Sequence, residues 1–399
     1  MGFSSRHEWI VVRVLLVSDF FPPVRGGLET HVDVLAANLC ERGHSVAVAT
    51  LTENPVARHP DVHVYTIPAA ATRLLPHADK QRPFHPPLPD PVAHRALGEV
   101  LRDFRPSVVH GHSWLTVSVP RRPNVPTVLT AHDYGWVCQL RTLLRPDDTL
   151  CGGPSARCLP CGAARYGYVK SAAMSIGTPL GRRSFHPTRV LAVSESVRQA
   201  VIPAFGSGVQ VVPNFVADDS PRDDVDAPGL PDVPFVMFAG DPSHHKGIDV
   251  LLDCWRGADA PNADLVLAVT KDFDRVLPAR VRTVRLAHEQ MKDAWTRAHV
   301  AIVPSLWADP FPTVALEAMA AGTAIVASRL GGLVDMLDDG VQGFLIAPGD
   351  AAAIVASINR LLADQELRLL MGEAARHRVQ RFAASSVVPD IERIYEEIQ

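Results

Sequence analysis

Apolar runs and helical patterns alternate along the first half of the chain. A mostly apolar run over residues 12–20 predicts a buried strand, and apolar residues at helical spacing predict a helix over 28–42 that ends at Gly43. Further strands are predicted over 45–51, 62–67, 107–112, 127–131, 189–193 and 209–212. Strands that alternate with helices in this way form a doubly wound parallel sheet.

The same alternation starts again after a linker rich in Asp, Pro and Gly over residues 217–233. Strands are predicted over 235–239, 264–269, 300–304 and 324–327, and helices over 248–255, 289–298, 312–321, 351–362, 365–382 and 385–398. We therefore predict an α/β protein with two Rossmann-like domains, over 1–216 and 234–380. They would face each other across a cleft at the carboxyl ends of both sheets, with segment 381–399 packing back on the first domain.

Composition and charge limit the possible partners. With 47% apolar and 21% charged residues the chain has an ordinary globular composition, and a net charge of −4 argues against nucleic acid. No apolar run approaches the roughly 18–20 residues of a membrane-spanning helix, and no targeting segment is apparent. A cytoplasmic protein is predicted. Segment 69–91, with basic and apolar residues, either touches the inner membrane face peripherally or is a solvated loop.

Two short motifs stand between a predicted strand and a predicted helix. Gly26 and Gly27 lack a Cβ, so an anion could approach the backbone N–H groups at the helix start; a tight turn without a ligand is the alternative, and the motif alone does not decide between them. Lys246 stands in a similar place in the second half, where its ammonium group could reach a diphosphate.

The segment from Asp309 to Glu317 is the most informative. A strand ends at Pro304, Asp309 lies in the following loop, and Pro312 suits the first position of a helix. Glu317 falls among small apolar residues of that helix, where a carboxylate needs a partner such as a sugar or ribose hydroxyl, or else caps a neighbouring loop.

Taken together, these motifs resemble the retaining glycosyltransferases of family 4, which have the GT-B fold. The resemblance covers nearly the whole chain, and its motifs are modest singly but specific in this order. They are Gly26-Gly27, residues 42–46, 130–133, 193–196 and 212–214, Lys246-Gly247, residues 309–317, Gly331-Gly332 and residues 339–343.

The resemblance implies a role for each motif residue. The amides of Gly26 and Gly27 would meet the distal phosphate and sugar of a nucleoside-diphosphate sugar, His132 would face the transferred sugar, and Lys246 would hold the diphosphate and stabilise the leaving group. Asp309 would bind sugar hydroxyls and Glu317 the ribose. The donor would also contact Pro310, Phe311, Pro312 and Thr313.

The family further implies transfer of a hexose, from a UDP or GDP sugar, that retains the anomeric configuration without a metal cofactor. Either the leaving phosphate assists front-face attack, or a carboxylate forms a covalent intermediate. The acceptor, a cell-envelope glycan, a lipid or a small metabolite, stays open. A GT-B epimerase that acts on nucleotide sugars, or a non-catalytic sugar-nucleotide-binding relative, is the alternative.

Three positions depart from the family pattern. Asp241 stands where arginine is usual, so we expect it to point away from the diphosphate; Asp309 and Asp335 stand where glutamate is common. Two acidic triplets, Asp272–Asp274 and Asp224–Asp226, resemble the motif of metal-dependent transferases of another fold, but they lie in a loop and in the linker.

Four of the six cysteines cluster shortly after the motif over residues 130–133. Cys138, Cys151, Cys158 and Cys161 fall in a Pro- and Gly-rich loop over 138–161, and four thiolates in such a loop can close a tetrahedral zinc site. Free or redox-active thiols and an iron–sulfur cluster remain alternatives, and a cytoplasmic setting disfavours disulfides.

Overall fold

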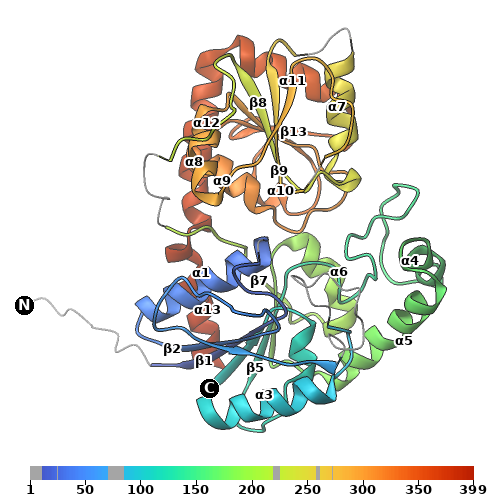
Figure 1. Cartoon of the computed structure of the whole chain (residues 1–399), viewed down its shortest axis with the longest axis vertical. Helices are drawn as coiled ribbons and strands as arrows, with labels where there is room; N and C mark the ends of the chain where they lie inside the picture. Colours follow the sequence, from blue (N-terminus) through green and yellow to red (C-terminus); the bar gives the residue numbers. More distant parts are fainter. Residues whose placement is uncertain (1–10, 25, 71–84, 219–224, 258–260, 272) are drawn as a thin grey trace, which may run out of the picture.

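The computed structural model describes the chain except residues 1–10, 25, 71–84, 219–224, 258–260 and 272 (Figure 1). Two α/β lobes stack along its long axis. The lower lobe holds a seven-stranded parallel sheet in the order β3-β2-β1-β4-β5-β6-β7. Its strands are β1 (Arg13–Ser18), β2 (Ser45–Thr50), β3 (His63–Thr66), β4 (Val108–Gly111), β5 (Thr127–Ala131), β6 (Arg189–Ala192) and β7 (Gln210–Val211).

Helices cover both faces of this sheet, as its buried apolar strands require. The helix α3 begins where Pro91 follows Asp90, whose side chain accepts hydrogen bonds from the N–H groups of Val92 and Ala93. The helices of this lobe are α1 (Gly27–Glu41), α3 (Pro91–Phe104), η1 (Trp114–Ser118), α4 (Cys158–Tyr166), α5 (Tyr168–Ser184) and α6 (Glu195–Phe205).

The upper lobe repeats the plan with six parallel strands in the order β10-β9-β8-β11-β12-β13. They are β8 (Phe235–Gly240), β9 (Asp264–Val269), β10 (Val281–Val284), β11 (Val300–Val303), β12 (Ile325–Ser328) and β13 (Gly343–Ile346). The helices are η2 (His244–Lys246), α7 (Ile248–Arg256), α8 (His288–Arg297), α9 (Thr313–Ala321), α10 (Leu333–Met336), α11 (Ala351–Ala363), α12 (Gln365–Val379) and η3 (Gln380–Phe382). In each sheet the strand order reverses direction between the first and fourth strands, and ligands bind at such switch points.

The last helix, α13 (Ala384–Glu397), returns to the lower lobe and lies against α1 (Figure 1). The chain crosses between lobes twice at one place, because Val216 and Ala383 pair as a short parallel bridge. Glu392 accepts hydrogen bonds from Arg42 at 2.6 Å and from the ring of His44 at 2.8 Å, and the hydroxyl of Tyr395 lies 2.6 Å from His110. The end of the chain is thus part of the first lobe's core.

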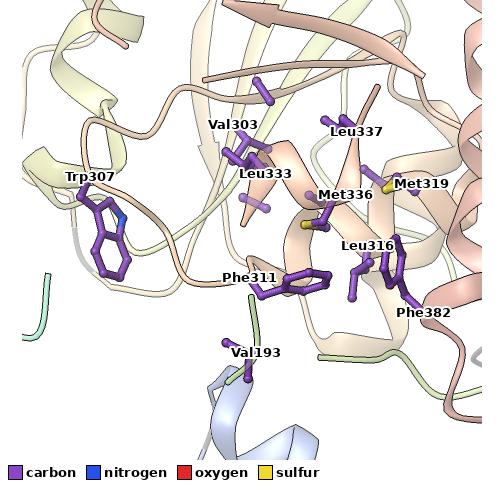
Figure 2. Packing of buried hydrophobic residues seen from close by; sticks show 14 of the residues in the cluster. Val193, Val303, Trp307, Phe311, Leu316, Met319, Leu333, Met336, Leu337 and Phe382 are labelled. Carbon is purple, nitrogen blue, oxygen red and sulfur yellow. The ribbon is translucent and has the colours of Figure 1, made fainter. Parts of the chain in front are cut away.

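Apolar packing continues from one lobe into the other. In Figure 2, Val193, just after β6, lies beneath Phe311 of the upper lobe, and both belong to one buried cluster with Leu316 and Met336. A cluster shared by both lobes stabilises their contact through burial of apolar surface.

Some predicted elements need correction. Residues 158–161, predicted as part of a loop, form the first turn of α4, and the helix predicted over 365–382 ends at Val379 before a 3₁₀ turn. The motif over 224–226, the one over 272–274 and the predicted surface segment 69–91 each include residues that the structure does not describe.

Candidate functional site at the interdomain contact

The loops that carry the predicted motifs follow the strands at the two switch points. The Gly26-Gly27 turn lies between β1 and α1, and Lys246 ends the 3₁₀ turn that follows β8. Segment 304–312 joins β11 to α9. His132 follows β5, next to the first switch point. The topology therefore brings motifs that are up to 290 residues apart to facing edges of the two sheets.

The charged part of the site is a lysine–aspartate pair. Lys246 Nζ lies 2.5 Å from Asp309 Oδ2, and the aspartate side chain is only 6% exposed. The ammonium group also lies 5.1 Å from the ring centre of Trp307. A buried carboxylate needs a charged partner, so the pair keeps a cation in place at this edge of the sheet.

Asp241 is neutralised by a different lysine. Its carboxylate lies 2.5 Å from Lys271 Nζ, and although burial favours protonation, this pairing lowers the pKa of Asp241. The carboxylate that replaces the family's usual arginine therefore has a cation of its own. We refer to the Lys246–Asp309 and Lys271–Asp241 contacts together as the charged pairs.

Segment 308–313 is one part of the upper lobe that contacts the lower one. The hydroxyl of Tyr134 donates to the carbonyl of Ala308 at 2.7 Å, and the side chain of Asn214 donates to the carbonyl of Phe311 at 3.3 Å. A Cβ placed on Gly27 would lie 3.7 Å from the side chain of Thr313. The glycine turn thus faces the start of α9 directly.

Two glycines support this segment from behind. A Cβ at Gly331 would lie 2.4 Å from the carbonyl oxygen of Asp309, and one at Gly332 would lie 2.1 Å from that of Pro310. Gly332 also donates its N–H to the carbonyl of Asp309 at 2.7 Å. Side chains at 331 and 332 would push the loop out of place, which is the physical reason for the glycine pair.

Glu317 lies on α9, partly buried, and accepts a hydrogen bond of 3.4 Å from the indole N–H of Trp295. Burial raises the pKa of this carboxyl group, with smaller opposing effects from His288 and Trp295. The long contact to Trp295 leaves capacity for further donors, as hydroxyls of a ribose would provide.

Beside His132 the structure assembles three histidines that the sequence did not single out. Nitrogen atoms of His31, His112 and His132 all lie within 4.8 Å of one another, and His112 Nδ1 is 3.0 Å from His132 Nε2. The ring of His110 lies against that of His112, with ring centres 4.2 Å apart and the planes tilted by 35°. We call these four residues the histidine cluster. His110 lies in β4, His112 directly follows β4 and His132 directly follows the adjacent strand β5, which is a sequence signal that could have indicated the cluster.

Burial lowers the pKa of every member of the histidine cluster, to about 4 for His132 and about 3 for His110. At neutral pH these rings are therefore uncharged. Asn214, whose side chain donates to the carbonyl of Phe311 of the upper lobe, partly opposes the lowering of the His132 pKa. Among the residues that the structure describes, the nitrogens of His31, His112 and His132 come closest to a metal-binding geometry, but two of them bond to each other.

The four clustered cysteines lie at the side of this site, and all are free thiols. Cys158 and Cys161 lie on the first turn of α4, three residues apart and hence on one face of that helix.

Comparisons with known proteins agree with this arrangement. The family described as Glycosyltransferase Family 4 matches residues 25–220, and the one described as Glycosyl transferases group 1 matches residues 222–378. The chain belongs to the family-4 type of GT-B glycosyltransferases. This confirms the fold class and family predicted from the sequence.

Relatives and solved structures resemble the chain over nearly its full length. The phosphatidyl-myo-inositol mannosyltransferase of Mycobacterium leprae is 27% identical over 97% of this chain and 97% of its own. The glycogen synthase of Mycobacterium tuberculosis H37Rv is 26% identical over 92% of this chain and 90% of its own. Sucrose-phosphate synthase from Thermosynechococcus elongatus has a TM-score of 0.72 at 21% identity, covering 96% of this chain and 98% of its own. Anabaena HepE in complex with UDP has a TM-score of 0.65 at 18% identity, covering 96% and 100%.

No helix in the described part of the chain has both the length and the apolar character that crossing a membrane would require.

Proposed function

We propose that this glycosyltransferase moves a hexose from a UDP or GDP sugar to an acceptor hydroxyl and retains the anomeric configuration. The observation that carries the proposal is the position of segment 308–313. It joins the Lys246–Asp309 pair on one side to Gly27 and Asn214 on the other. A donor bound there would meet a cation and backbone N–H groups at its diphosphate, and a carboxylate at each of its two sugars, the transferred hexose and the ribose.

Each part of the donor has a suitable partner in this proposal. Lys246 holds the diphosphate, aided by the backbone N–H groups at Gly26 and Gly27, where α1 begins. Glu317 accepts hydrogen bonds from the ribose, and Asp309 from the sugar. Residues Pro310, Phe311, Pro312 and Thr313 line the sugar and phosphates. Because Lys246 pairs with Asp309 in the structure, a bound diphosphate would share this lysine with the aspartate.

The proposed reaction is a front-face displacement. The bond between the anomeric carbon and the phosphate oxygen breaks, and its electron pair goes to the nucleoside diphosphate, where Lys246 stabilises the charge. The acceptor oxygen bonds to the same face of the anomeric carbon, and its proton passes to the leaving phosphate oxygen. His132, uncharged at neutral pH, hydrogen-bonds a sugar hydroxyl without repelling the developing positive charge of the ring.

A covalent intermediate would instead need a carboxylate on the far face of the sugar. No residue is an unambiguous candidate for this carboxylate, and Asp309 is already bonded to Lys246. We therefore favour front-face transfer. Lysine and the positive end of α1 take the place of a divalent cation at the diphosphate, so transfer should proceed without added Mg²⁺.

For the acceptor, the mannosyltransferase and glycogen synthase relatives support a lipid-linked or glycan hydroxyl. In that case the protein acts in the cytoplasm, with peripheral contact to the inner membrane face where the acceptor is a lipid. An epimerase is not favoured, because the relatives named above are transferases and synthases.

The test starts with thermal shifts of the protein in UDP, GDP, ADP and dTDP sugars, which identify the donor by the largest rise in Tm. Transfer is then followed by NMR of the product. The same anomeric configuration as in the donor is expected, whereas inversion would exclude the proposed reaction. Glu317→Gln should raise the KM for the donor with little change in kcat, because the ribose is remote from the reacting bond. Turnover of donor without any acceptor to an epimeric sugar would instead indicate the epimerase.

A further inference from the structure

The segment between His132 and α5 forms a lobe that contains four of the six cysteines. It begins with a hairpin, in which Leu144 pairs with Leu150 and the N–H of Cys151 donates to the carbonyl of Leu143 at 2.7 Å. It continues into α4 and α5, which lie against each other (Figure 1). Within this segment, we call residues 138–161, which carry the four cysteines, the cysteine lobe.

Three contacts bring the ends of the cysteine lobe together. Gln139, next to Cys138, donates to Ser175 at 2.6 Å and accepts from Ser171 at 2.8 Å, both on α5. A Cβ on Gly162, next to Cys161, would lie 2.1 Å from the side-chain oxygen of Gln139. Gln139 and Gly162 are thus in contact. The first and last cysteines of the cysteine lobe, Cys138 and Cys161, directly precede these two residues.

The two inner cysteines are held by turns. The thiol of Cys151 bonds the carbonyl of Gly153 at 3.3 Å, and the N–H of Ser155 donates to the sulfur of Cys158 at 3.2 Å. Burial, followed by the nearby thiols of the other three cysteines, raises the pKa of Cys161. The other three thiols thus act on Cys161 electrostatically, but no three of the four sulfur atoms, all in the described part of the chain, lie within 4.8 Å of one another, as the histidine nitrogens do.

We propose that the cysteine lobe binds one Zn²⁺ through the thiolates of Cys138, Cys151, Cys158 and Cys161. Zinc prefers four sulfur ligands in tetrahedral geometry, and on binding it would release the four thiol protons to solvent. The resulting charge of −2 is offset by Arg145, which is near Cys161, and by the positive end of α4, where Cys158 and Cys161 lie. Binding would therefore require the hairpin and the start of α4 to draw the sulfurs closer together than they lie in this structure.

The lobe connects the zinc to both sides of the donor site. Arg141 donates to Asp133 at 2.9 Å, directly after His132. At the hairpin tip, Asp148 lies 2.9 Å from the ring of His244, two residues before Lys246 (Figure 1 shows this hairpin rising toward the upper lobe). The zinc therefore stabilises a segment that contacts Asp133 in the lower α/β lobe and His244 in the upper one, and so holds the loop that carries Lys246. This effect on the donor loop rests on the proposed function, whereas the metal site does not.

Metal content tests the site directly. Inductively coupled plasma mass spectrometry of the protein, purified without a polyhistidine tag, should find one zinc ion per chain. A mercurial reagent that modifies thiols should release this zinc. Co²⁺ in its place should give the intense sulfur-to-cobalt absorption of a tetrahedral thiolate site. Cys158→Ser and Cys161→Ser should lose the metal, whereas Cys40→Ser, outside the lobe on α1, should keep it.

Several results would overturn the proposal. Iron with acid-labile sulfide would show a cluster instead of zinc, and a disulfide between lobe cysteines in the purified protein would show a redox pair. If the native protein contains no metal and all four thiols of the cysteine lobe react freely with a thiol reagent, the lobe folds without a metal ion. The wild-type measurement decides even if the serine variants fail to fold.

A second variant tests the link to the donor loop. Asp148→Ala removes the contact to His244 but no ligand, so the zinc content should stay at one per chain while the KM for the donor rises about threefold. An unchanged KM with full zinc would limit the metal to local stabilisation of the lobe. If the protein transfers no sugar at all, the metal measurements still stand, so failure of the two proposals can be told apart.

Discussion

On the lower side of the interdomain contact lies the histidine cluster, whose rings are uncharged at neutral pH, whereas the upper side carries the charged pairs. Neutral imidazoles suit a reacting centre at which positive charge develops on a sugar. Fixed lysine charges suit a diphosphate that gains negative charge. In the proposed reaction, each lobe would then contribute the electrostatics that its half of the donor requires.

The largest effect is expected from the charged side. Lys246→Ala should lower kcat/KM about 100- to 1000-fold, because one group that stabilises transition-state charge contributes about 3–4 kcal/mol. Initial rates with the identified donor measure it. Lys170→Ala removes an exposed lysine on α5 as a control and should leave the rate about unchanged. A loss below about tenfold in Lys246→Ala would place the leaving-group charge elsewhere.

The histidine side should respond to pH through stability. An unfolded histidine takes up a proton near pH 6.5, but burial lowers the folded pKa of His132 to about 4. Between these values the unfolded state binds more protons, so the stability present above pH 6.5 is lost as the pH falls toward 4. Urea unfolding at pH 7.5 and 5.0 should show a loss of about 1–2 kcal/mol for this histidine alone.

His132→Gln should reduce the pH dependence of stability by the contribution of this one histidine, because the other three buried rings still titrate, whereas His63→Gln, at an exposed position of the edge strand β3, should leave it unchanged. An unchanged slope in His132→Gln would mean that its ring is already protonated in the folded protein, and the contrast between the two sides would fail.

The sequence predicted the fold well where strands are buried on both faces, because continuous apolar runs such as β1 are unambiguous. It missed the two edge strands of the upper sheet, β10, whose Arg282 and Thr283 face solvent, and β13, whose Phe344 is only partly buried. The helices α5 and α6 were missed for another reason. Each contains a proline, Pro179 or Pro203, that interrupts the helical pattern.

For the site, the sequence indicated the loops but not their contacts. Lys246 and Asp309 were assigned to different parts of the donor, and only the strand order β8-β11 shows that they pair across 63 residues. His31 and His112 drew no attention because lone histidines on apolar elements are ordinary core residues. Long-range packing cannot be inferred from local patterns, since it depends on which strands are neighbours.

A smaller effect, on the KM for the donor, is expected from removing the lysine that pairs with Asp241. Lys271→Ala would leave this carboxylate unpaired near the diphosphate, and a repulsion of about 1 kcal/mol should raise the KM for the donor about fivefold. Adding Asp241→Asn in the same chain should restore the KM. If Lys271→Ala alone changes nothing, Asp241 points away from the donor and Lys246 acts as the cation without it.

The smallest effect concerns one of the contacts that join the two lobes. Asp335 of α10 accepts a hydrogen bond from the N–H of Glu195 at 2.8 Å, so a carboxylate of the upper lobe lies at the start of α6 in the lower one. Asp335→Ala should cost about 1 kcal/mol of stability, as loss of a helix cap does. Asp350→Ala, which removes a cap within the upper lobe, should cost a similar amount. Only Asp335→Ala should also raise the KM for the donor, about twofold, because it alone loosens the contact between the histidine cluster and the charged pairs. Equal donor KM values in the two variants would show that the apolar cluster shared by the lobes is sufficient to hold the site closed.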